Sequence, residues 1–240
     1  MKQKIKLWWQ GLREGSDKDF CLMALFLTLV LFVYCYFGSQ SFFEKYFFGV
    51  KNAEYWKVIY HNLMAFVLFF GVGMIFSCFV CKKDPKDLYL GKGKWKLGLV
   101  LCAIGTVVCA ICGLSTVLDA EMQSTYPMIN FALHDWKMIL LYFVSYVLYY
   151  IGWEFLFRGM ALNMSKSKLG MLGAVLFSTL ISALIHTSIG GFGKPMVETL
   201  SAIAAGVIFA LVAKHTNSIW YGFYLHMAVG FFTDLFCFVI

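Results

Sequence analysis

The sequence predicts an all-α protein whose helices cross a lipid bilayer. Of its 240 residues, 61% are hydrophobic and only 14% are charged, whereas soluble domains are about 45–50% apolar and about 25% charged. Seven apolar stretches reach the length of about 20 residues that a membrane-spanning helix needs. This composition excludes an ordinary soluble enzyme, a disordered protein and a disulfide-stapled secreted module. We predict a polytopic helical membrane protein with about seven transmembrane helices.

The predicted spans follow one another with short polar gaps. They cover approximately residues 20–38, 58–81, 97–118, 138–164, 169–188, 197–213 and 217–240. The segment before the first span combines lysines with Trp8 and Trp9, which is typical of a helix that lies in the membrane interface. The aromatic-rich stretch 39–57 is expected along the outer interface.

The basic residues predict the orientation of the chain. With the N-terminus in the cytoplasm, fourteen Lys and Arg residues lie on the inner side and five on the outer side, and Arg158 lies within a span. This split satisfies the positive-inside rule. Together with anionic lipid headgroups, it explains the formal charge of +7 without nucleic acid. We expect an integral membrane protein with a cytoplasmic N-terminus, in contact with the lipid bilayer and with no nucleic-acid partner.

Ionisable side chains inside the spans are concentrated in the C-terminal half. Such groups are costly in a bilayer and usually face a protein interior or a water-filled cavity. The spans beyond residue 137 contain six of them: Glu154, Arg158, His186, Glu198, His226 and Asp234. We therefore expect residues 1–137, with the interfacial helix and three scaffold helices, to support a functional bundle of residues 138–240 within one membrane-embedded domain.

Each of these side chains also has a purely structural interpretation. Glu154 and Arg158 are spaced i, i+4 with the acid first, as in a helical ion pair. Glu198 follows Pro195 and would stabilise a helix N-terminus. Asp234 near the chain end is expected at the interface, as is His61 near the outer edge of the second span. Two His and two Glu in one small bundle nevertheless form a group that can activate water.

Three short motifs resemble the CAAX protease and bacteriocin-processing (CPBP, or Abi) family. Trp153-Glu154-Phe155-Leu156-Phe157-Arg158 is similar to its Glu-Glu-x-x-x-Arg motif, in the Trp-Glu form of a bacterial subset. Ser182 to His186 is similar to the second motif, and His226 to Gly230 to the His-x-x-x-Asn/Asp motif. The resemblance covers roughly residues 138–235, and the bacterial subset implies a location in a bacterial inner (plasma) membrane.

The resemblance implies a glutamate-dependent intramembrane endopeptidase in which residues 138–240 form the catalytic helical bundle. It implies that His186 is the first catalytic His and helps a Glu to activate water, while His226 stabilises the oxyanion. Two positions depart from the family pattern. Trp153 replaces the first Glu, and Gly230 replaces the Asn or Asp. Glu198 is a candidate for the missing acid, and Asp234 for the missing polar group.

The expected mechanism needs no cofactor. Glu154 or Glu198 would act as general base toward a water bonded to His186, His226 would donate to the oxyanion, and Arg158 would orient Glu154. An alternative is a zinc-type site formed by Glu198, His186 and His226, because three N/O ligands plus water suit that metal.

We weigh three functions. The first is an intramembrane, metal-independent protease that hydrolyses a peptide or a membrane-anchored protein. The second is a catalytically silent relative that binds a peptide or acts as a bacteriocin-immunity-type membrane protein. The departures from the family motifs at Trp153 and Gly230 favour this second function. The third is a small transporter with a proton relay, against which the absence of a sequence repeat argues.

Overall fold

The computed structural model describes residue 5 and residues 17–187 and 193–240, and every regular element in these ranges is helical. The expected N-terminal interfacial helix lies outside the described residues. In the N-terminal half, the helices are α2 (Lys18–Phe37), α3 (Gln40–Tyr46), α4 (Ala53–Ala65), η1 (Phe66–Val72), α5 (Gly73–Ile75), η2 (Phe76–Val80), η3 (Pro85–Leu88), α6 (Trp95–Thr116) and α7 (Ala120–Thr125). The C-terminal half contains η4 (Phe131–Leu133), α8 (Trp136–Glu154), η5 (Phe155–Ala161), α9 (Leu162–Leu184), α10 (Met196–Thr216) and α11 (Trp220–Val239).

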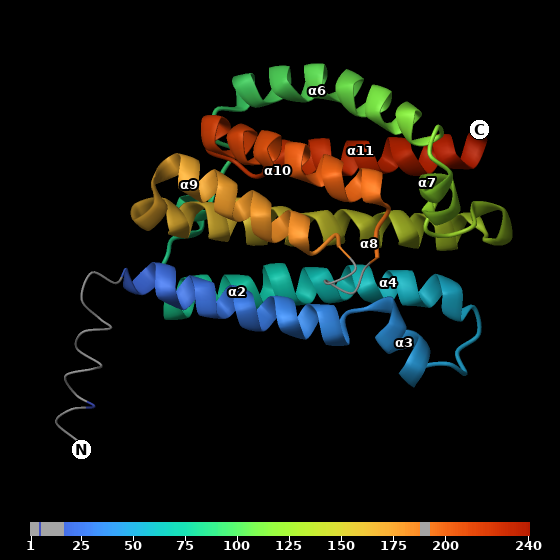
Figure 1. Ribbon diagram of the computed structural model, residues 1–240, viewed down its shortest axis with the longest axis horizontal. Coiled ribbons are helices and arrows are strands. Elements are labelled where there is room, and N and C mark those ends of the chain that lie inside the picture. Colours follow the sequence, from blue (N-terminus) through green and yellow to red (C-terminus); the bar gives the residue numbers. More distant parts are fainter. Residues whose placement is uncertain (1–4, 6–16, 188–192) are drawn as a thin grey trace.

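Seven membrane crossings account for the described helices. Six helical stretches are long and apolar enough to span a membrane, and one of them, Trp136–Leu184, is 49 residues long. At 1.5 Å per residue that stretch would measure about 74 Å, more than twice the hydrocarbon thickness of about 30 Å. It is broken at Gly170, where φ is 67°, and the chain reverses direction there (Figure 1). The prediction of an all-helical membrane protein with about seven spans is confirmed.

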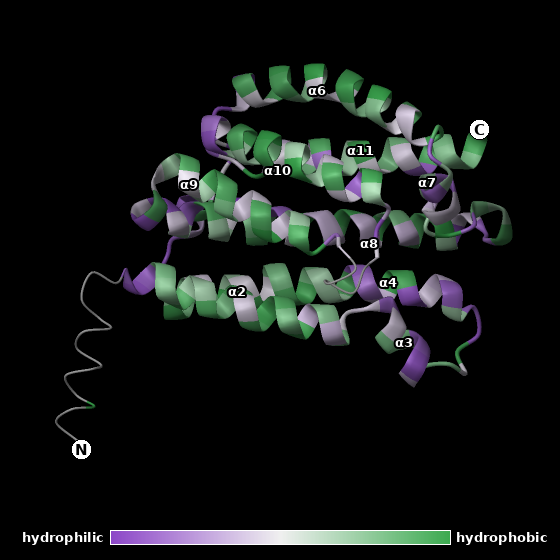
Figure 2. Ribbon diagram, in the orientation of Figure 1, coloured by the Kyte–Doolittle hydropathy of each residue, from purple (hydrophilic) through white to green (hydrophobic). Residues whose placement is uncertain are grey.

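The helices are stacked side by side along one long axis. α6 packs against α11, α9 against α10, and α4 against α8 (Figure 1). Hydrophobic residues cover the middle of the long helices, whereas hydrophilic residues gather toward the two ends (Figure 2). Large apolar side chains such as Leu99, Ile104 and Ile111 on α6 are exposed. Lipid acyl chains are the surroundings that this outer surface requires.

The fifth span is short and ends within the bundle. From Gly170 to Leu184 it contains 15 residues, which rise only about 22 Å. The end of α9 and the start of α10 lie near the middle of the long axis (Figure 1). Non-helical backbone at membrane depth is tolerated where protein or a water-filled cavity surrounds it. The early end of α9 therefore places His186, two residues after this helix, inside the membrane region.

Glycines allow α6 to approach α11 closely. A Cβ atom at Gly105 would lie 2.4 Å from Leu225 Cδ2, and one at Gly113 would lie 2.8 Å from the carbonyl carbon of Phe232. Small residues at such crossings let helix backbones pack without side chains between them. The contact at Gly113 is with backbone and leaves little room for adjustment.

We expect Gly113→Ala to lower the free energy of unfolding by about 1–3 kcal/mol, as overpacking does, measured by thermal unfolding in detergent. Gly71→Ala is the matched control, because a Cβ there meets nothing within 4 Å. Equal stability of the two variants would contradict the close packing of α6 on α11.

Candidate active site

Glu154 and Arg158 form a fully buried ion pair at the junction of α8 and η5. Arg158 Nη1 lies 3.2 Å from Glu154 Oε1, and the two side chains are 2% and 0% exposed. η5 continues α8 with the wider turns of a π-helix, which are frequent at functional sites. The i, i+4 pair expected from the sequence is therefore present.

His226 on α11 joins this pair. Its Nδ1 lies 2.8 Å from Glu154 Oε1, and its ring packs between Tyr150 and Phe209 with centroid distances of 4.4 and 5.0 Å. Gly222, one turn earlier on α11, leaves room for the carboxylate, because a Cβ there would lie 3.1 Å from Glu154 Oε2. A His whose Nδ1–H donates to a carboxylate has a fixed ring orientation and directs Nε2 away from that partner.

His186 is held by backbone just after the end of α9. Its Nδ1 lies 2.8 Å from the Ser182 carbonyl oxygen, so Nδ1–H donates and Nε2 carries the lone pair of a neutral ring. The indole of Trp153 lies edge-on to this ring at 5.3 Å. Trp153 thus occupies the first-Glu position as a buried packing partner of His186.

Glu198 in the first turn of α10 has partners from two segments. Tyr126 donates its hydroxyl proton to Glu198 Oε2 at 2.7 Å, and Lys194 Nζ lies 3.5 Å from Glu198 Oε1. Lys194 also donates to the Tyr126 hydroxyl and lies 4.6 Å from the centre of that ring. Burial, reinforced by the nearby Glu198 carboxylate, raises the pKa of Tyr126 well above its ordinary value. Tyr126 therefore remains a neutral hydrogen-bond donor to Glu198.

His186, Glu198 and His226 line one small cavity of about 40 Å³. A space of this size can hold a water molecule where polar partners are present. Glu154 and Arg158 do not line it, and Glu154 lies behind His226. The remaining lining side chains are mostly aromatic or polar: His61, Asn62, Tyr126, Met128, Tyr146, Tyr149, Tyr150 and Lys194.

Asp234 lies elsewhere and is buried in the helical bundle, and its expected depth at the interface stays a prediction. The side chain is 1% exposed, and Tyr142 donates to its Oδ2 at 2.6 Å. It does not line the cavity. Asp234 is buried because α11 packs against α8, which brings the Tyr142 hydroxyl to it.

His61 also faces the protein interior, and its expected depth at the headgroup level stays a prediction. His61 is 3% exposed, with Nε2 3.0 Å from the Tyr34 hydroxyl and Nδ1 2.8 Å from the Gly38 carbonyl oxygen. Asn62 beside it donates to Ser145 at 3.0 Å. The second span therefore contributes directly to the wall of the cavity.

The sequence reasoning overlooked the tyrosines of α8. Tyr142, Tyr146, Tyr149 and Tyr150 follow helical spacing and lead to Trp153 and Glu154 on the same helix. Residues spaced i, i+4, i+7 and i+8 lie on one face of a helix. This row of tyrosine hydroxyls, which leads to an acid within a span, was the sequence pattern that could have predicted their place in the site.

Two tyrosine hydroxyls occupy the space beside Gly230. A Cβ at this position would lie 2.4 Å from both the Tyr146 and the Tyr150 hydroxyl oxygens. Tyr150 donates to Tyr146 at 2.9 Å. At the position of the family's Asn or Asp, α11 therefore has no side chain, and α8 supplies two hydroxyl groups instead.

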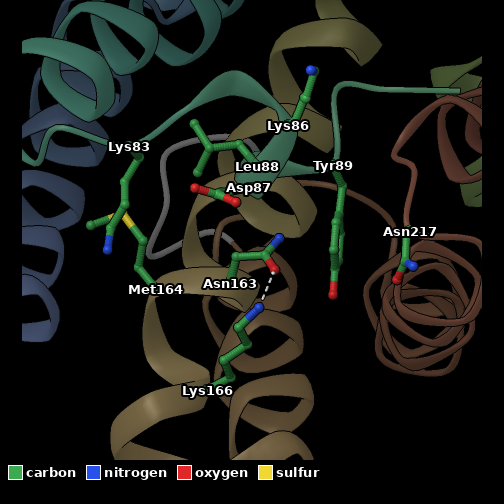
Figure 3. Close-up of a pocket in the computed structure, with 9 residues that line it drawn as sticks. All are labelled: Lys83, Lys86, Asp87, Leu88, Tyr89, Asn163, Met164, Lys166 and Asn217. Carbon is green, nitrogen blue, oxygen red and sulfur yellow. Dashed lines mark hydrogen bonds between the residues drawn. The ribbon is translucent and has the colours of Figure 1, made fainter. Parts of the chain in front are cut away.

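No group of three or more His, Cys, Asp and Glu side chains is placed to hold a metal ion within residue 5 and residues 17–187 and 193–240. A larger cavity of about 460 Å³ lies away from these residues, beside Lys83, Lys86 and Lys166 (Figure 3). The small cavity contains the acid–base groups, so we take it as the candidate active site despite its size.

Comparison with known proteins identifies the segment that contains these groups. Residues 135–232 match the family of type II CAAX prenyl endopeptidases, Rce1-like. This Rce1-like segment begins at the N-cap of α8 and includes Glu154, His186, Glu198 and His226. The match agrees with the resemblance of the three motifs to the CPBP family. The chain matches no curated protein and no solved structure.

We expect Glu154→Gln to destabilise the protein by about 3–5 kcal/mol, the cost of breaking a buried ion pair. The guanidinium of Arg158 cannot lose its proton and would remain charged in the interior. Arg158→Met should cost less, because the remaining carboxylate keeps His226 as a partner. Thermal unfolding in detergent measures both variants, and a Glu154→Gln protein as stable as the wild type would contradict this account.

Proposed function

We propose that the chain is an intramembrane endopeptidase that hydrolyses a peptide or membrane-associated protein with water activated by glutamate and histidine. The observation that carries the proposal is the common cavity of His186, Glu198 and His226, with Glu154 bonded to His226. The match of residues 135–232 to a protease family supports the same reaction class.

Glu198 is the proposed general base. Its carboxylate lines the cavity, whereas that of Glu154 does not, and a base must lie within hydrogen-bond reach of the proton that it removes. A water between Glu198 and His186 Nε2 would lose a proton to Glu198 as its oxygen attacks the substrate carbonyl carbon. Glu198 would return that proton to the leaving amine as the C–N bond breaks. Lys194 pairs with the ionised form of Glu198.

Glu154, Arg158 and His226 act as one unit in this scheme. When the His226 ring is protonated, Nδ1–H donates to the carboxylate of Glu154 and Nε2–H can donate to the oxyanion. Arg158 keeps Glu154 oriented across one helical turn. Fixed donors in a site that excludes bulk water stabilise developing charge strongly.

Tyr146 and Tyr150 are proposed as the second source of oxyanion hydrogen bonds. Both line the cavity, and the Tyr150 ring packs against His226 at a tilted angle of 49°. When Tyr150 donates to Tyr146, the hydroxyl proton of Tyr146 is available to a substrate oxygen. The pair would perform the task that a side chain at position 230 has in the family pattern.

The name of the matched family suggests the first substrates to test. We would compare a peptide that ends in a prenylated CAAX sequence with its unprenylated form. A difference in cleavage between the two shows whether the protein recognises the lipid or the peptide. The scheme uses no metal ion. A metal held by Glu198, His186 and His226 is the alternative that chelators test.

A catalytically silent peptide-binding or bacteriocin-immunity-type protein is the second candidate. The observation that favours it is Trp153, which is 2% exposed and packs against Phe69 and Phe157 where the family pattern has an acid. Such a protein would bind the peptides without cleaving them.

With a cleaved peptide in hand, we expect Glu198→Gln and His186→Ala each to lower kcat/KM by at least about 100-fold, the lower range of acid–base contributions. Mass spectrometry of the products measures the rates. Glu121→Gln and His215→Ala are matched controls, because both side chains are exposed and neither lines the cavity. Binding of the probes without cleavage by the wild type would favour the silent relative, and inhibition by chelators would favour the metal alternative.

We expect Tyr150→Phe and Tyr146→Phe to lower kcat by up to about 100-fold with little change in KM, because oxyanion donors act mainly in the transition state. Tyr224→Phe is the control, since that α11 hydroxyl contacts Thr106 instead of the cavity. An unchanged kcat in the Tyr146→Phe/Tyr150→Phe double variant would exclude the tyrosine pair and leave the Glu198–His186 scheme intact.

A further inference from the structure

The larger cavity lies at the end of the bundle that the lysine distribution places in the cytoplasm. Its volume is about 460 Å³, and it is open to the outside between the loop that follows η2, the start of α9 and the turn between α10 and α11 (Figure 3). Lys83, Lys86 and Lys166 line it together with Asp87, while Leu88 and Met164 contribute buried apolar surface. The cavity thus has basic side chains at its rim and apolar side chains in its interior.

The charges around this cavity leave an excess of positive charge. Three lysines face one acid, Asp87. Lys83 is paired from outside the cavity with Asp19, at 2.6 Å. Within the described part of the chain, Lys86 and Lys166 form no ion pair. The Lys166 ammonium points toward Asn163 inside the cavity, whereas the Lys86 side chain extends outward from the rim and would have to turn inward to contact an anion there (Figure 3).

The side of the cavity that carries Lys166 is fixed before any ligand binds. Lys166 Nζ donates to Asn163 Oδ1 at 3.1 Å and lies 5.7 Å from the centre of the Tyr89 ring. Asn163 in turn donates to the Gly159 carbonyl oxygen at 2.9 Å. Tyr89 is fixed by its own carbonyl, which accepts a hydrogen bond from Ile219 N at 2.9 Å. A preformed site loses little conformational entropy when a ligand binds.

The depth of the cavity selects the source of the anion. Lys86 follows the candidate span that ends at Val80, and Lys166 lies one turn before the break at Gly170, at the end of the bundle where the lysine distribution places the lipid phosphates. Anionic lipids of the cytoplasmic leaflet attract basic side chains by about 1 kcal/mol for each Lys or Arg near the surface, and basic pockets between transmembrane helices bind lipid headgroups. The apolar surface of Leu88 and Met164 suits the glycerol and the first acyl carbons.

We propose that this cavity binds the phosphate-bearing headgroup of an anionic glycerophospholipid, with Lys86 and Lys166 as its ammonium ligands and Asn163 and Tyr89 beside them. This site is separate from the candidate active site and does not depend on the proposed peptidase activity. Its ligand would hold the η3 loop against the starts of α9 and α11.

Native mass spectrometry of the full-length protein in detergent, with added phosphatidylglycerol or phosphatidylcholine, tests the proposal. We expect phosphatidylglycerol to bind at least about fivefold more tightly, and Lys86→Gln/Lys166→Gln to weaken its binding by about tenfold or more, as loss of two ammonium contacts predicts. Lys82→Gln/Lys92→Gln is the matched control, because both lysines are exposed in the same loop region and do not line the cavity. This control should bind within about twofold of the wild type.

Equal loss in the two double variants, or no preference for phosphatidylglycerol, would overturn the proposal. Inorganic phosphate added as a competitor separates the two sources of the anion. If it displaces the lipid at equal concentration, the site is a free-phosphate site and the lipid assignment is wrong. Lys86→Glu, a single change on the exposed loop, repeats the test if the double variant does not fold, and thermal unfolding verifies that each variant is native.

Discussion

The carboxylate of Glu154 is completely buried in the bundle, where neither bulk water nor lipid headgroups can stabilise its charge. Arg158 supplies the opposite charge from the next helical turn, and His226 supplies a hydrogen bond from α11. Both partners require that α8, η5 and α11 keep one register. Gly222 contributes by letting α11 approach the carboxylate. The need to satisfy one buried acid therefore fixes how the two central helices meet.

The short α9 provides the second element of the site. Because it ends within the bundle, the chain can re-enter as α10 and bring Glu198 and Lys194 to the depth of His186. The loop before α8 adds Tyr126, and the second span adds His61 and Asn62. The cavity is thus enclosed by parts of the chain on both sides of residue 137, so the division into scaffold and functional bundle describes the sequence better than the packing.

The spans and the candidate acids were predictable, because hydropathy and charge act locally along the chain. The i, i+4 spacing of Glu154 and Arg158 was sufficient to predict their pairing. Contacts between distant helices were not predictable in the same way. The bond from Tyr142 to Asp234 and the burial of His61 depend on which helix faces lie together, and hydropathy does not encode that choice. The tyrosine stripe was visible in the sequence, but only the closeness of Gly230 to it shows what its hydroxyl groups replace.

The geometry at Gly230 also constrains which substitutions could convert this site into the form that has Asn or Asp at position 230. An Asn at position 230 requires a Cβ in the space that the hydroxyls of Tyr146 and Tyr150 fill. A side chain at position 230 is therefore accommodated only if the two tyrosine side chains move from their present positions. Position 230 and the tyrosine positions of α8 therefore form an epistatic set, in which the effect of any change on one helix is decided by the residues already present on the other.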